Sequence, residues 1–168
     1  MSFLQRAADR YARVMRTLVM ALAAVTNISI LAMMLITCAD ILLRLFGRPI
    51  IGAYDLVRLS GAVAMACALP YVTAVKGHVA IEYFFQKLRL AKRNLVDRVL
   101  NTVAITLFCL LGNESLRVGA RLKLRGEVTA TLQLPIFWVL WLIGACCFLT
   151  AMVIVFNLLQ PRKEMIRP

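Results

Sequence analysis

Apolar residues fill four long runs of this chain, and charged residues gather in the short segments between them. The first run is the clearest, because no charged residue occurs from Thr17 to Ala39. At about 1.5 Å per residue, this run covers roughly 35 Å, enough to cross a hydrocarbon core about 30 Å thick. The pattern predicts an all-α integral membrane protein, a single membrane domain with four transmembrane helices. The predicted spans are residues 17–46, 54–75, 97–118 and 134–159.

The ends of these spans carry local signals. The second run has Asp55 and Arg58 in its first turns, and its small residues between Gly61 and Ala66 predict close helix approach. Pro135 fits the first turn of the fourth helix, where a missing N–H costs little. The basic N-terminus resembles that of a signal peptide, but the first apolar run continues well beyond any cleavage site. A retained first helix is therefore expected.

The two longer connections have patterns of their own. Between the second and third spans, apolar residues lie on one face of a helix and cations on the other, which predicts an amphipathic helix at the cytoplasmic membrane surface over residues 79–93. Between the third and fourth spans, polar and apolar residues alternate around Gly126. This alternation indicates extended structure or a short hairpin, with a continuing helix as the alternative. The residues expected at the lipid interface are Phe84, Phe85, Lys87, Arg89, Trp138 and Trp141.

Charge fixes the expected orientation. The net charge of +12 would suit a nucleic-acid-binding protein, but 62% of the residues are hydrophobic and the cations cluster between apolar runs. This is the pattern of a membrane protein with flanking anchors. With both termini on one side, that side holds thirteen Lys and Arg residues and the other side holds seven. The excess predicts that both termini are cytoplasmic.

Several kinds of chemistry are disfavoured by the residue inventory. The five cysteines all lie in apolar runs without C-x-x-C spacing, so they suit small apolar fillers better than a thiol oxidoreductase. A single histidine excludes haem held by paired histidines within the chain, although a quinone-binding anchor subunit stays open. No phosphate loop, nucleophile motif or metal-ligand spacing occurs. We expect no enzymatic activity and no cofactor in this chain.

Lys76, His78 and Glu82 are the first candidate site. They follow the second span and are open to two interpretations. One is polar side chains where a membrane helix emerges into water, and the other is a proton-transfer group. The first is favoured because the chain holds no second histidine to complete a site.

Two acid–base pairs flank the connection between the first two spans. Asp40 and Arg44 are spaced i, i+4, and Asp55 and Arg58 are spaced i, i+3, so each pair can neutralise itself at the membrane boundary. A cluster of ion pairs that closes the two helices is the favoured interpretation. Coordination of a transported ion is the alternative, disfavoured because transporters usually bind their substrates near the midplane.

Glu114 is the best candidate for a functional charge within the membrane. A small proton-coupled four-helix transporter would need such a carboxylate, and this is the main alternative function. However, Arg117 and Arg121 follow Glu114 at i+3 and i+7, which indicates a helix end leaving the bilayer.

With these features placed, the chain resembles the small membrane subunit of tripartite ATP-independent periplasmic (TRAP) transporters, the DctQ-like family. The resemblance runs from the first span to the fourth and rests on four short motifs. These are Asp40-x-x-x-Arg44, Gly52-x-x-Asp55, the Lys76–Glu82 element around Gly77-His78, and Leu132-x-Leu134-Pro135.

The resemblance implies a role in the bacterial inner membrane. The family's small subunit is a fixed scaffold for a large DctM-like membrane subunit, which carries the substrate and sodium sites. A periplasmic DctP-like binding protein delivers an organic acid. The helices are then expected to form a tilted bundle along the large subunit. The cations expected to attract the binding protein are Arg48, Arg117, Arg121, Lys123 and Arg125.

Overall fold

The computed structural model of the chain describes residues 3–75 and 90–159. These residues form four helices: α1 (Phe3–Leu45), α2 (Ala53–Ala74), α4 (Leu90–Arg125) and α5 (Phe137–Leu159). All four are long and apolar enough to cross a membrane. The predicted all-α membrane fold with four spans is therefore confirmed.

The helices are longer than the apolar runs alone predict. α1 begins at Phe3 rather than near residue 17, because no glycine or proline interrupts the basic segment before the first span. α4 is continuous from Leu90 to Arg125, without the break expected near residue 95, and it contains no glycine or proline before Gly112. Most of the predicted interfacial helix, residues 79–89, lies outside the described residues, and residues 90–93 belong to α4.

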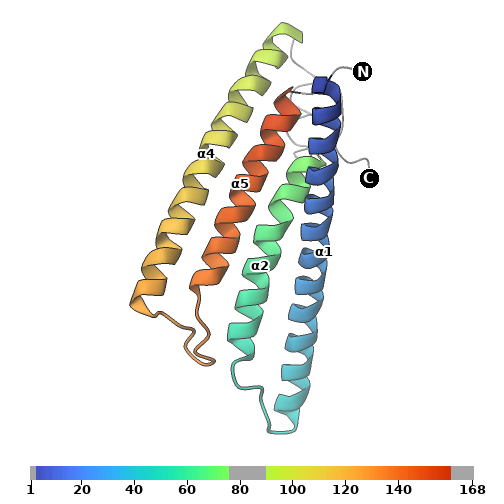
Figure 1. The fold of residues 1–168 in the computed structure, drawn as a ribbon. Helices are drawn as coiled ribbons and strands as arrows, with labels where there is room; N and C mark the ends of the chain where they lie inside the picture. The colour runs from blue at the N-terminus through green and yellow to red at the C-terminus, as the bar shows by residue number, and fades with distance from the viewer. Residues whose placement is uncertain (1–2, 76–89, 160–168) are drawn as a thin grey trace.

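The four helices lie side by side in one layer, in the order α4, α5, α2, α1 (Figure 1). The expected bundle is thus an open one, since each inner helix packs against a neighbour on either side and each outer helix packs mainly against one. In the most apolar 18-residue stretch of each helix, 50% of the residues are buried in α5 but only 6% in α4. The layer therefore has two broad faces that its own helices leave uncovered.

Two apolar clusters hold the inner part of the layer together. One joins α1, α2 and α5 through Met15, Val19, Ala74, Val153 and Phe156. The other joins α2 and α5 through Ala66, Cys67 and Cys146, with Leu22 of α1 packed against it. Both thiols in this second cluster are buried and free, as expected for small apolar fillers.

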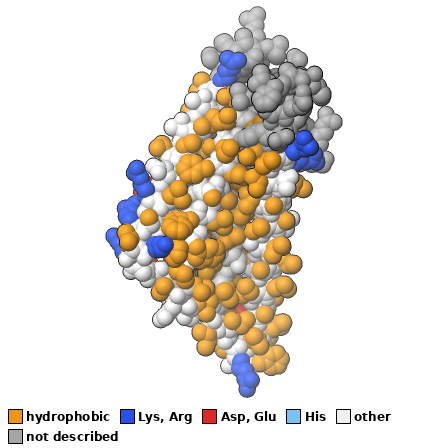
Figure 2. All heavy atoms as spheres, in the orientation of Figure 1, with side chains coloured by type: hydrophobic (Ala, Val, Ile, Leu, Met, Phe, Trp, Pro, Cys, Tyr) orange, Lys and Arg blue, Asp and Glu red, His pale blue; other side chains and the backbone are white. Residues whose placement is uncertain are grey.

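Apolar side chains cover most of the face shown in Figure 2, and the visible Lys and Arg side chains lie at its margins. Such a surface suits hydrocarbon or another membrane protein. The connections 46–52 and 126–136 lie together at the end of the layer opposite the start of α1 (Figure 1). We call this the connection end.

Candidate functional site

Asp40 organises the first connection. It lies in the last turns of α1 and is 8% exposed. Its Oδ2 accepts a hydrogen bond from Arg44 Nε at 2.8 Å, and its Oδ1 accepts one from the Ile50 backbone N–H at 2.9 Å. The expected pair with Arg44 is present, but the same carboxylate also fastens the 46–52 connection back onto α1. Arg44 itself is largely exposed.

Asp55 organises the α4–α5 connection, and here the expected ion pair with Arg58 does not form. Asp55 is 3% exposed, and its Oδ2 accepts hydrogen bonds from the backbone N–H groups of Thr131 at 2.9 Å and Leu132 at 3.1 Å. Arg58 is exposed and forms no ion pair within 4 Å among the described residues. Backbone N–H groups without a helical partner need an acceptor, and a carboxylate is a strong one. Asp55 therefore fastens the α4–α5 connection to the start of α2.

Gly52 explains why this connection can lie so close to α2. Its φ of 84° is in the left-handed region that favours glycine, and a Cβ at this position would overlap the side chain of Leu132. Gly52 thus makes room for Leu132, while Asp55 binds the Leu132 N–H. The motifs Gly52-x-x-Asp55 and Leu132-x-Leu134-Pro135, far apart in the sequence, form one site in space.

The 126–136 connection is a compact turn held by Thr129. The Thr129 N–H donates to the Leu134 carbonyl at 2.9 Å, and the Leu134 N–H donates to Thr129 Oγ1 at 3.1 Å. Val128 and Pro135 form an isolated antiparallel bridge, so the alternation around Gly126 marks a short hairpin-like turn after α4. Pro135 precedes α5, which begins at Phe137, instead of lying in its first turn. We use the name carboxylate brace for Asp40 and Asp55 together with the backbone N–H groups that donate hydrogen bonds to them, which are those of Ile50, Thr131 and Leu132.

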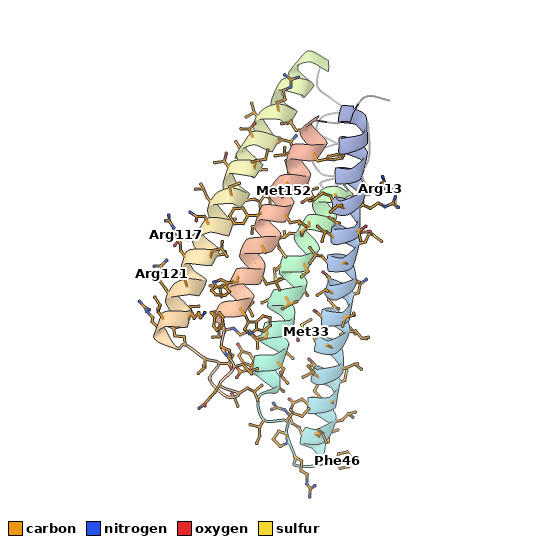
Figure 3. All side chains as sticks on the ribbon, in the orientation of Figure 1. Arg13, Met33, Phe46, Arg117, Arg121 and Met152 are labelled. Atoms are coloured by element: carbon orange, nitrogen blue, oxygen red, sulfur yellow. The ribbon has the colours of Figure 1, made fainter. Side chains whose placement is uncertain are left out.

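The expected docking cations lie in two places. Arg48 is exposed in the 46–52 connection, and the other four are exposed on the last turns of α4. Arg117 and Arg121 project from the outer side of α4, away from α5 (Figure 3). Arg121 Nη2 donates to Glu114 Oε1 at 2.8 Å, and Arg125 lies 3.6 Å from Glu127. Arg48 and Arg117 have no ion-pair partner within the described residues.

Lys123 is held by the aromatic residues at the start of α5. Its Nζ lies 5.2 Å from the centre of the Trp141 ring and 5.5 Å from that of Phe137, distances typical of cation–π contacts. Trp141 also covers Gly119 of α4. Trp141 is therefore a packing residue between α4 and α5 as well as a predicted interfacial one. Trp138 is 41% exposed, and its interfacial role stays a prediction.

The remaining candidates lie outside the described residues. They are Lys76, His78, Glu82, Phe84, Phe85, Lys87 and Arg89. Within the part of the chain that the structure describes, no group of three His, Cys, Asp or Glu side chains could hold a metal ion. The described site is therefore an arrangement of hydrogen bonds that fixes two connections, with exposed cations in the first connection and on the last turns of α4.

Comparison with known proteins agrees with the motifs that meet at this end. The sequence profile described as "Tripartite ATP-independent periplasmic transporters, DctQ component" matches residues 33–164, which include Asp40, Gly52, Asp55 and Pro135. Comparisons with curated proteins and with solved structures found no match. Because the matched region covers most of the chain, this protein belongs to the DctQ family, the small-subunit component of TRAP transporters.

Proposed function

We propose that this chain is the fixed small permease subunit of a TRAP-type secondary transporter in the bacterial inner membrane. It holds a large DctM-like subunit in place and helps a DctP-like binding protein dock. The large subunit carries out sodium-driven uptake of an organic acid, and the sodium sites belong to that subunit. Both termini are cytoplasmic, which places the connection end in the periplasm.

The open layer of helices is the observation that carries this proposal. Each helix packs mainly against the helices beside it in the layer, so the described helices surround no path for a solute. A layer of this kind instead offers long apolar faces against which another membrane protein can pack. The carboxylate brace keeps the two connections in fixed positions at one end of that layer. A fixed support with a rigid periplasmic rim is what a scaffold and docking subunit requires.

The position of Glu114 disfavours the alternative, an autonomous proton-coupled transporter. Its side chain is 57% exposed and is paired with Arg121. A carboxylate that exchanges protons with a transported solute needs a site enclosed by several helices. Glu114 instead lies on an exposed surface of α4, about three turns before the helix ends at Arg125.

Reconstitution in liposomes tests the proposal. We expect no sodium-driven uptake of labelled organic acids by this chain alone, and none by the large subunit alone. Uptake should require both subunits and the binding protein, because the cargo sites and the fixed support are on different chains. The large subunit should also co-purify with this chain from the membrane. Uptake by the isolated chain would contradict the scaffold function and restore the autonomous transporter.

A further inference from the structure

A groove of about 400 Å³ runs between α1 and α2 within the membrane-spanning part of the layer. Three of its lining residues, Ala23, Ala24 and Ala68, are small. Met20 and Tyr71 also line it, as does Asn27, two turns further along α1 than Met20. From Met20 to Asn27 the groove therefore follows α1 for about 10 Å.

Asn27 is an unusual residue to find at this depth. It lies near the middle of the charge-free run Thr17–Ala39, roughly 15 Å from either end and thus close to the bilayer centre. Its side chain is exposed and has no hydrogen-bond partner in the described residues. The neighbouring Thr26, in contrast, donates to the Leu22 carbonyl at 3.0 Å and lies 3.4 Å from the Ala64 carbonyl.

The unpaired amide indicates what kind of occupant fits the groove. An amide left in hydrocarbon without a partner is costly, and the acyl chain of a lipid has no group that can hydrogen-bond to it. The polar atoms of lipid headgroups lie about 15 Å away along the membrane normal. A transmembrane helix with a hydroxyl or amide side chain can supply the bond, and the alanines allow its backbone to approach closely.

The shape of the groove favours a different chain over a second copy of this one. In a symmetric pair the same surface lies on both sides of the contact. Two grooves facing each other would leave a void, and voids lose packing energy. A single convex helix from another protein fills the groove instead.

We propose that one transmembrane helix of the large subunit lies in this groove and forms a hydrogen bond with the Asn27 side chain near the bilayer centre. The inference rests on the proposed function and adds the place and chemistry of the contact between the subunits. Tyr71 also lines the groove and carries a second polar group, its hydroxyl.

Two substitutions test the contact in the co-expressed complex. Asn27→Leu removes the amide at similar size, and Ala24→Phe fills the groove from an exposed position. We expect Asn27→Leu to weaken retention of the large subunit on the tagged chain about three- to tenfold across a dilution series in detergent. Ala24→Phe should weaken it at least as much. Asn113→Leu, the same change at an exposed position on α4, is the matched control and should stay within about twofold.

A photo-crosslinking amino acid at position 20 identifies the neighbour in the membrane. We expect an adduct of this chain with the large subunit, and none from the same probe at position 113. An adduct of two copies of this chain, or of chain and lipid only, would overturn the inference. So would unchanged retention in both groove variants while the wild-type complex forms, a result that leaves the proposed function standing. Failure of the wild-type chain to retain the large subunit would overturn both.

Discussion

At the residue scale, the Asp55 carboxylate binds backbone N–H groups instead of forming an ion pair with a neighbouring cation. Its carboxylate accepts hydrogen bonds from the backbone N–H groups of Thr131 and Leu132, which lie 76 and 77 residues further along the chain. Arg58, one helical turn away, has the right sign and spacing for a pair, yet it is exposed. The packing of Leu132 against Gly52 brings these backbone donors to the start of α2, where the carboxylate is their acceptor.

This arrangement predicts that two neighbouring substitutions differ in their effect on thermal stability. Asp55→Ala leaves the Thr131 and Leu132 N–H groups without an acceptor, and we expect the melting temperature in detergent to fall by about 2–6 °C. Arg58→Ala should change it by less than about 1 °C, because an exposed arginine outside an ion pair contributes little. Thermal unfolding of both variants measures the difference. Equal destabilisation by the two changes would support the ion pair instead of the carboxylate brace.

At the element scale, glycines set the contact between α4 and α5. A Cβ on Gly144 would lie 3.0 Å from the Leu116 side chain and 3.1 Å from the Gly112 carbonyl oxygen, and a Cβ on Gly112 would lie 3.3 Å from the Gly144 oxygen. The two backbones therefore pass each other closely, as small residues permit in lipid. Gly61, where the sequence predicted close approach, is less crowded, since its nearest neighbour is Met33 Sδ at 3.7 Å.

The two glycines should respond differently to the same substitution. Gly144→Ala forces the α4–α5 contact apart, because a backbone carbonyl cannot rotate away as a side chain can. We expect a loss of about 1–3 kcal/mol in the free energy of unfolding. Gly61→Ala makes ordinary contacts and improves helix propensity, so it should be neutral or slightly stabilising. Unfolding in mixed micelles compares the pair, and equal losses would show that the α4–α5 contact is no tighter than the α1–α2 contact.

At the scale of the whole molecule, the connection end presents cations that differ in how far they are neutralised. Arg121 and Arg125 have acidic partners, and Lys123 lies against two aromatic rings. Arg48 and Arg117 are exposed without such partners in the described residues. These two residues therefore contribute most to the potential that an acidic surface of the binding protein would meet.

Charge reversal should weaken docking in a salt-dependent way. We expect Arg48→Glu with Arg117→Glu to lower the affinity of the assembled complex for the binding protein about five- to tenfold at low salt. The difference should shrink to less than about twofold in 0.5 M NaCl, because salt screens exposed charges. Arg13→Glu with Arg98→Glu, exposed positions toward the opposite end of the layer, is the control and should have no effect. Equal affinity at every ionic strength would exclude this docking surface.

The sequence by itself determined the four helices, their membrane character and the family of the protein. These properties depend on local quantities, namely the length of apolar runs, the absence of helix breakers and the cations that flank the runs. The pair of Asp40 with Arg44 was also predictable, because i, i+4 spacing on one helix fixes which side chains meet. The same rule failed for Asp55 and Arg58, since spacing cannot show that other donors compete for the carboxylate.

Only the tertiary structure decided what lies beside what. The order of the helices in an open layer, the meeting of Gly52 with Leu132, and the groove around Asn27 join residues from different parts of the chain. Hydrophobicity places a helix in the bilayer but does not select its neighbour, because lipid and a second helix are almost equally apolar. Close packing and the pairing of buried polar groups make that selection, and both depend on positions in space that no local pattern in the sequence contains.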